Sequence, residues 1–282
     1  MTTRMTALGG VFAAVVAALW LQSSRSDPPA TLAGPTAAYP NRPEGMTLIG
    51  SSDGSVKQSE GHAFGIPGFS EWYDHNQPSD IAVVADPTNP TGSGRSLRFT
   101  YPSDDNKAGS TTAQRFPGGP YRELYIMTRV FMERSGWDRF GNKFFYVGAA
   151  IGARRGASRP TQYYVDRPSG GRLRVINQHN GSVVLIASVE QPPKGSKTNP
   201  ITQGVWLNVE YLLTAESAPG AGNGRVSVWV NNKLVGANSA VNWTGRQDRD
   251  VGFDGMEWYG EVNSIPSTSY YRLGELYLAG KK

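Results

Sequence analysis

Gly224-Arg-Val-Ser-Val-Trp-Val-Asn231 is the stretch that decides the fold of this 282-residue chain. Its three valines alternate with a serine and a tryptophan, and a period of two is typical of a strand with one buried face. Similar runs occupy residues 204–213 and 270–279, and turn residues follow each of them. No stretch of comparable length after the N-terminus has a helical period. The chain is therefore predicted to be all-β, with antiparallel strands.

Further strands are expected upstream of these three runs. They cover residues 46–50, 81–85, 96–101, 111–116, 123–132, 143–149, 161–166, 172–178 and 182–189. The turns between them are rich in glycine (34 in the chain) and proline (19). The last two runs join through Asn180-Gly181, which favours a type I′ hairpin turn. Strands at this spacing, without a repeat or a second linker, predict a single-domain antiparallel β-sandwich over residues 46–282.

The first 26 residues have the composition of an export signal. Arg4 precedes an apolar run over residues 7–21, the arrangement of a signal peptide. The run is short for a membrane span, which needs about 20 apolar residues, and residues 22–26 contain no Ala-x-Ala cleavage site. A cleaved signal peptide and a retained anchor helix both stay open. Either one predicts a secreted, periplasmic or cell-surface protein that meets a membrane only through this segment.

A Pro-rich stretch follows at residues 27–45 and is expected to be an extended tether. The absence of cysteine excludes disulfides, thiol catalysis and thiolate metal sites. The net charge of +5 is not gathered into a basic stripe, so no nucleic-acid partner is expected. No cofactor is required by any motif, and no metal ligand is assigned. Structural calcium and solvated turn acids are both open for the loop acids Asp104, Asp105, Asp248, Asp250 and Asp254.

Several short sequence segments follow one another in a recognisable order. They occupy residues 81–102, 123–132, 141–148, 206–211, 228–235 and 271–280. In this order they resemble the concanavalin A-like lectin/glucanase jelly rolls, and among these the polysaccharide-lyase-like branch related to alginate, glucuronan and heparin lyases. The resemblance covers nearly all of residues 46–280. It implies two curved antiparallel sheets, the concave one holding a glycan chain, and members that are lyases, hydrolases or non-catalytic binding modules. Fold does not choose among these activities.

Hydrolysis is not expected, because it needs two carboxylates on either side of the scissile bond. No Glu-x-Asp-x-x-Glu strand occurs, and Glu123, Glu210 and Glu275 each stand alone in their strands. β-Elimination beside a uronate needs instead a donor that neutralises the carboxylate, together with a base and an acid such as His or Tyr. The candidates for base and acid are His179 and Tyr164. The candidate substrate-binding residues are Arg129, Tyr146, Gln162, Asn177, Trp72 and Trp258.

Each candidate also has a purely structural interpretation. His179 borders the Asn-Gly turn, Tyr146 and Tyr164 have the residue type of sheet-packing aromatics, and Arg129 can pair with a neighbouring acid. Trp72 and Trp258 can belong to loops that cover a sheet edge. The lyase motifs are incomplete, since residues 121–125 keep only Arg-Glu-Leu of Arg-Ser-Glu-Leu-Arg, and Gln178-His179 lacks the middle residue of Gln-Ile-His.

Three functions follow from this reading. The first is an exported, monomeric jelly roll that binds a polysaccharide, acidic chains included, along its concave sheet. The alternative is a polysaccharide lyase that cleaves a uronate-containing glycan by β-elimination. A structural cell-surface sandwich is the third.

Overall fold

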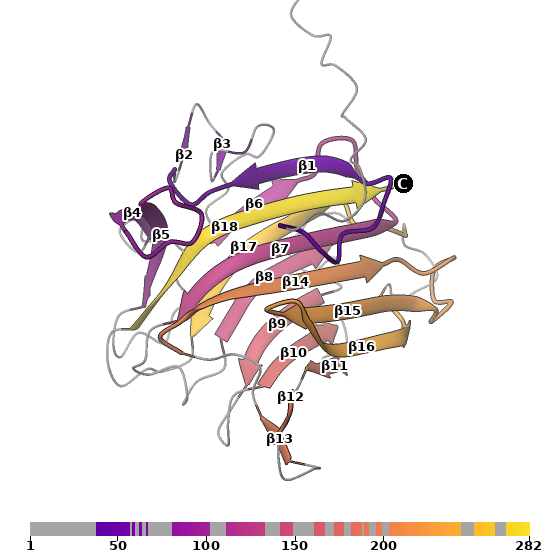
Figure 1. The fold of residues 1–282 in the computed structure, drawn as a ribbon. Coiled ribbons are helices and arrows are strands. Elements are labelled where there is room, and N and C mark those ends of the chain that lie inside the picture. The colour runs from indigo at the N-terminus through magenta and orange to yellow at the C-terminus, as the bar shows by residue number, and fades with distance from the viewer. Residues whose placement is uncertain are drawn as a thin grey trace, which may run out of the picture. The chain divides into compact units, whose positions relative to one another are not determined.

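Two large antiparallel β-sheets make up the fold (Figure 1). The computed structural model describes residues 38–56, 58–59, 62–63, 66, 81–101, 111–132, 142–148, 161–166, 172–177, 182–187, 189–191, 196–198, 203–243, 251–262 and 269–282, all within the unit Thr31–Lys282. All helices and strands assigned among these described residues are β-strands; none is a helix. The predicted all-β class is therefore confirmed, while the expected N-terminal helix lies outside the described residues.

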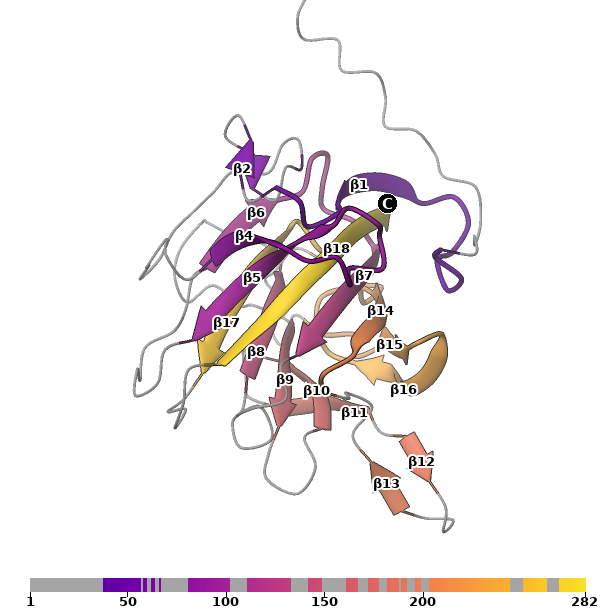
Figure 2. The same ribbon diagram turned by 60° about the vertical axis from the view of Figure 1, so that its left-hand side comes forward.

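The larger sheet has eight strands, in the order β16-β15-β14-β7-β18-β5-β4, with β1 paired to β18 beside this path. The strands are β1 (Thr47–Ser52), β4 (Ile81–Ala85), β5 (Arg95–Tyr101), β7 (Glu123–Met132), β14 (Trp206–Thr214), β15 (Gly224–Val230), β16 (Lys233–Val241) and β18 (Ser269–Lys281). One edge of β18 pairs with β7, and the other pairs with β5 at its start and β1 at its end. Figure 2 shows β5 and β18 side by side.

The smaller sheet has six strands, in the order β11-β10-β9-β8-β17-β6. They are β6 (Thr111–Arg115), β8 (Asn142–Gly148), β9 (Thr161–Asp166), β10 (Arg172–Asn177), β11 (Ser182–Ala187) and β17 (Gly255–Val262). Two short ribbons pair β2 (Gln58–Ser59) with β3 (His62–Ala63), and β12 (Val189–Gln191) with β13 (Ser196–Thr198). The predicted hairpin is confirmed as the antiparallel pair β10–β11, although its turn lies outside the described residues.

Besides the strands of the two short ribbons, one strand of each large sheet was not expected from the sequence. β16 follows β15 through Asn231 and Asn232, whose φ angles of 49° and 65° are those of a type I′ turn, and Val230 pairs with Lys233 across it. β17 occupies a segment whose flanking glycines and aspartates resemble a loop. It nevertheless pairs with both β6 and β8, and so lies inside the six-stranded sheet.

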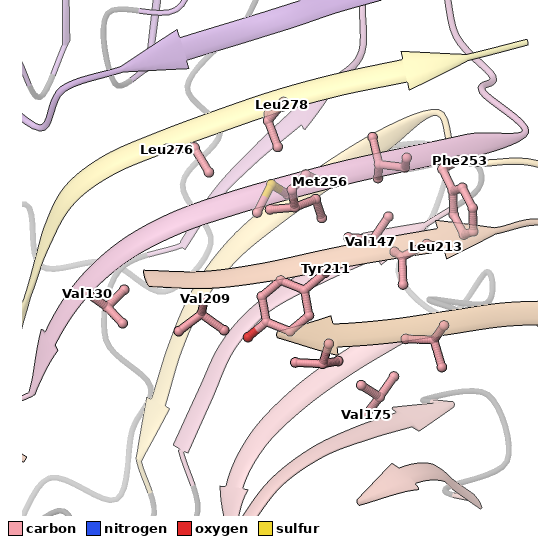
Figure 3. Close-up of a cluster of buried hydrophobic side chains, with 14 of the residues drawn as sticks. Val130, Val147, Val175, Val209, Tyr211, Leu213, Phe253, Met256, Leu276 and Leu278 are labelled. Carbon is pink, nitrogen blue, oxygen red and sulfur yellow. The ribbon is translucent and has the colours of Figure 1, made fainter. Parts of the chain in front are cut away.

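The core lies between the two sheets, and Figure 3 shows side chains of both meeting there. The eight-stranded sheet contributes Val130, Val209, Leu213, Leu276 and Leu278, and the six-stranded sheet contributes Val147, Val175 and Met256, all buried. Complete burial of such a side chain stabilises the fold by about 1.5–3 kcal/mol. Because side chains of a strand alternate between its faces, each sheet has one face toward the core and an outer face away from it.

Residues 38–46, here called the N-terminal strap, lie on the outer face of the eight-stranded sheet. Met46 is completely buried there, and the Tyr39 ring stacks on Tyr277 with a centroid distance of 3.9 Å. The rest of this second apolar cluster is Tyr125, Met127, Ala279 and the partly buried Leu212. The sequence predicts an extended tether over residues 27–45. Its described part is packed instead, because an aromatic ring and an arginine there find partners on the sheet.

Candidate functional site

The outer face of the six-stranded sheet is the candidate site. Of the side chains on β8 to β11 the structure describes Val147, Val175 and Leu185, all buried in the core. Val147 pairs with the buried Met256 of β17, and Val175 pairs with Leu185. These pairs define the core positions of four strands. The alternate positions of the same strands therefore belong to the outer face.

Polar residue types occupy the middle of two rows of alternate positions across the sheet, here called the outer-face rows. The register continues the rows into Ile176 and Ile186 on one side and places Glu261 opposite Lys143 on the other. The first row is Glu257, Tyr146 and Gln162, and the second is Lys143, Tyr164 and Arg174. Both rows belong to one face, since Gln162 and Tyr164 are two residues apart in β9. Direct cross-strand neighbours have Cβ atoms about 4.5–5.5 Å apart. The register thus brings the two rows into one patch in the middle of the sheet.

Three of the candidate residues fall in this patch: Tyr146, Gln162 and Tyr164. Asn177 and Trp258 are in the same sheet but outside the rows. Asn177 lies two residues after the buried Val175, and Trp258 lies two residues after the buried Met256. Residues two apart in a strand belong to the same face, so both are at core-face positions. Trp72 and His179 lie outside the described residues.

Arg129 is not part of this patch. It belongs to β7 in the eight-stranded sheet, where its Nε lies 2.7 Å from Glu275 Oε2. The Tyr39 hydroxyl of the strap donates to the other Glu275 oxygen at 2.8 Å. The interpretation that pairs Arg129 with a neighbouring acid is the one that the structure supports. Arg129 therefore lies in a different sheet from Tyr146, Gln162 and Tyr164, because strand alternation reveals a face but not the sheet to which that face belongs.

The sequence analysis missed Lys143, Arg174 and Glu257. A signal for Arg174 exists in the alternation of Arg172-Leu-Arg-Val175, where two apolar residues mark one face and two arginines the other. Lys143 lies three residues before Tyr146, a spacing that normally puts two residues on opposite faces of a strand. A bulge in β8 between them brings both to the same face, and the sequence does not reveal this bulge. Glu257 could not be placed while β17 was taken for a loop.

A second cluster of ionisable groups lies beneath the strap. Glu210 is completely buried and accepts hydrogen bonds from the Tyr125 hydroxyl (2.6 Å) and from Asn41 Nδ2 (3.0 Å). Arg42 Nη1 donates to the Tyr277 hydroxyl at 2.5 Å. Burial, reinforced by the hydrogen bond to Glu210, raises the pKa of Tyr125 far above its usual range. These hydrogen bonds hold the strap to the sheet.

The same cluster bears on the question of hydrolysis. Its two carboxylates, Glu210 and Glu275, each accept a tyrosine hydroxyl and are covered by the strap. Burial, followed by the Glu275 charge and hydrogen bond, raises the pKa of Tyr39 above its usual range, so this phenol stays a donor. Because both carboxylates are covered and hydrogen-bonded in this way, neither can act as the acid or base of a glycosidase pair.

Within the described ranges, no group of three or more His, Cys, Asp or Glu gathers as a metal site. The candidate calcium acids at 104, 105, 248 and 250 lie outside those ranges. A helix long and apolar enough to cross a membrane is likewise not found among the residues that the structure describes.

Solved structures share this arrangement of strands. The PL-14 alginate lyase from Aplysia kurodai superposes with a TM-score of 0.59 at 12% identity, over 83% of this chain and 99% of that chain. The fold is therefore the β-jelly roll of that structure, in agreement with the predicted β-sandwich. The alginate lyase vAL-1 from Chlorella virus matches at a TM-score of 0.50 and 14% identity, over 76% and 93% of the two chains.

The jelly roll is also shared by proteins of other activities. The carbohydrate esterase vb_24B_21 from the Shiga toxin-encoding bacteriophage phi24B matches at a TM-score of 0.51 and 10% identity, over 84% of this chain and 100% of that chain. No protein-family model matches the sequence, and neither does any curated protein. Likeness at these identities is a likeness of fold. Function has to be argued from the outer-face rows.

Proposed function

We propose that the protein binds a polysaccharide chain across the outer face of its six-stranded sheet. The observation that carries this proposal is the register of the outer-face rows, which align six polar or aromatic-polar residue types opposite an apolar core. Four neighbouring strands at about 4.8 Å spacing offer a surface about 14 Å across. An extended chain of sugar rings is a ligand that fits a surface of this width and largely polar composition.

The residue types favour an acidic glycan. Lys143 and Arg174 flank Tyr164 in the second row, and both are cationic donors for a carboxylate. Gln162 and Tyr146 lie in the adjoining row and add an amide, a hydroxyl and an aromatic ring. The proposed ligand class is therefore a uronate-containing polysaccharide, with neutral chains bound more weakly.

The test is isothermal titration of the protein with uronate oligosaccharides and with carboxyl-reduced forms of the same chains. Arg174→Gln should weaken uronate binding about tenfold or more, since a hydrogen bond to a charged group is worth about 1.5–3 kcal/mol. Lys233→Gln is the matched control, because Lys233 is an exposed cation on the eight-stranded sheet. Equal affinity of the wild type and Arg174→Gln for uronate chains would count against this site.

A second candidate function, uronate lyase, is favoured by the position of Tyr164 between two cations. In this scheme Lys143, Arg174 and Gln162 neutralise the uronate carboxylate, which makes the proton on C5 removable. His179, two residues beyond the end of β10, takes that proton. The Tyr164 hydroxyl protonates the glycosidic oxygen as the C4–O bond breaks and a C4=C5 double bond forms.

Catalysis and binding are separated by a single assay. Lyase activity would create ultraviolet absorbance from the unsaturated uronate, and Tyr164→Phe would abolish it while retaining substrate affinity. Binding without any new absorbance selects the non-catalytic function. A protein that neither binds nor cleaves acidic or neutral glycans would be assigned to the structural cell-surface class.

A further inference from the structure

A third row of residues crosses the outer face of the eight-stranded sheet, away from the strap cluster. Its members, in register from β5 to β14, are Arg98, Arg272, Phe131 and Trp206. All four are partly exposed, while their strand neighbours Leu97, Leu273, Val130 and Leu207 are buried in the core. This row is named the arginine row.

Its two arginines are direct cross-strand partners. Like charges in that position repel each other. Asp86 neutralises one of them, since its Oδ2 lies 2.6 Å from Arg272 Nη1. Both guanidinium groups lie near the Tyr270 ring, with Cζ-to-centroid distances of 5.8 Å for Arg98 and 6.0 Å for Arg272. Of the two adjacent cations, Arg272 is therefore the one that is paired with this carboxylate.

The arginines also retain unused hydrogen-bond donors. Among the described residues, Arg98 Nε and Arg272 Nε are buried and have no hydrogen-bond partner. A guanidinium carries five N–H donors in a planar fork that matches a carboxylate. Both Nε atoms are buried, so an anion would meet these partly exposed arginines at their remaining N–H donors. Excess charge and unused donors coincide at this one position.

The surroundings of the pair are held in place before any ligand arrives. Asp86 accepts hydrogen bonds from Thr88 and Ser96 as well as from Arg272. Burial alone would raise the pKa of Asp86, but these hydrogen bonds and the Arg272 charge lower it below its ordinary value. The Arg272 Cζ lies 4.0 Å from the centroid of the Phe131 ring. An ordered guanidinium binds an anion without first losing side-chain entropy.

The row continues into aromatic surface on the side of Trp206. The Trp206 ring lies 5.6 Å from that of Phe131, and its Nε1 donates to the Thr88 hydroxyl at 3.1 Å. Aromatic faces beside cationic donors form a surface on which a sugar ring stacks while its carboxylate is held. Charge complementarity identifies the occupant as an anionic sugar.

We propose that the arginine row is a second glycan-binding site, at which Arg98 and Arg272 hold the carboxylate of a uronate residue. This inference relies on the proposed function for the ligand class and assigns a separate surface to it. The two sites lie on different sheets, so a chain long enough to reach both, or two chains, can be bound by one protein.

The experiment is calorimetric titration of the full chain with a mannuronate hexasaccharide and with its carboxyl-reduced counterpart. Arg98→Gln should abolish one class of sites or weaken it about tenfold or more, and Arg98→Lys should restore part of the loss. Lys233→Gln, the matched loss of one exposed cation, should leave binding unchanged. The carboxyl-reduced sugar should bind Arg98→Gln and the wild type equally.

The outcomes separate this site from the proposed one. If Arg174→Gln removes all uronate binding and Arg98→Gln removes none, the arginine-row site is wrong and the proposed function stands. If Arg98→Gln removes all binding and Arg174→Gln removes none, the reverse holds. Without sugar, Arg98→Gln should unfold at the same or a higher urea concentration, because a like-charge contact is relieved. A lower midpoint together with weaker binding would instead make Arg98 a structural residue and overturn the proposal.

Discussion

Removing the hydroxyl of Tyr125 should destabilise the protein strongly, because that hydroxyl serves a buried charge. Tyr125 and Glu210 are both completely buried, and the hydroxyl donates to Glu210 Oε2 at 2.6 Å. Tyr125→Phe keeps the ring and deletes the donor. A hydrogen bond to a charged group contributes about 1.5–3 kcal/mol. For a domain of this size that corresponds to a melting temperature about 3–12 °C lower.

Urea unfolding followed by tryptophan fluorescence measures this loss. Tyr39→Phe is the control, since its hydroxyl also serves a carboxylate but is only partly buried, and a loss of about 1 kcal/mol or less is expected there. A double-mutant cycle with Glu210→Gln should give a coupling energy of about 1 kcal/mol or more between Tyr125 and Glu210. A Phe variant within about 0.5 kcal/mol of the wild type would refute the reasoning.

Three further predictions concern the frame of the sandwich. Because the pKa of Asp86 is lowered in the folded protein, its ionised carboxylate contributes fully to stability above about pH 4, the pKa of the unfolded chain. This contribution is lost as the pH falls toward the pKa of the folded state. In urea titrations Asp86→Asn should therefore be less stable than the wild type at pH 7, and the difference should narrow below about pH 4. A Cβ at Gly54 (φ 73°) would overlap the Leu273 carbonyl oxygen, whereas a Cβ at Gly92 (φ 78°) would meet nothing within 4 Å. Gly54→Ala should therefore lower the melting temperature clearly more than Gly92→Ala does. Equal losses in the two variants would contradict this. Deletion of residues 1–46 should cost about 3 kcal/mol or more relative to deletion of residues 1–37, because it also removes Met46 and the strap hydrogen bonds. Equal urea midpoints of the two deletion variants would show that the strap does not stabilise the sheet.

A strand was most readable from the sequence where apolar and other residues alternate without interruption, as in β15. β17 was not, because its flanking glycines and aspartates have the composition of a turn, and only its pairing with β6 and β8 makes it a strand. The strap was hidden for a similar reason. Its proline content is that of a linker, while the contacts that fix it, such as Tyr39 with Glu275, span more than 200 residues.

The candidate site was predicted in part. Alternation indicated that Gln162 and Tyr164 share a face of their strand, and the register of the sheet brings Tyr146 beside Gln162. Arg129 was grouped with them because alternation is local, whereas the sheet that a strand joins depends on partners far along the chain. For β7 those partners are β14 and β18, and they take Arg129 to the other sheet.

The central claim, that a polysaccharide lies across the outer-face rows, is tested most directly by hydrogen–deuterium exchange with and without a uronate oligosaccharide. Amide exchange should become slower on binding in β8, β9 and β10, the strands that carry Lys143, Tyr164 and Arg174. We expect this protection to be lost once Arg174 is replaced, as in Arg174→Gln. Binding that leaves exchange in these three strands unchanged would contradict the account.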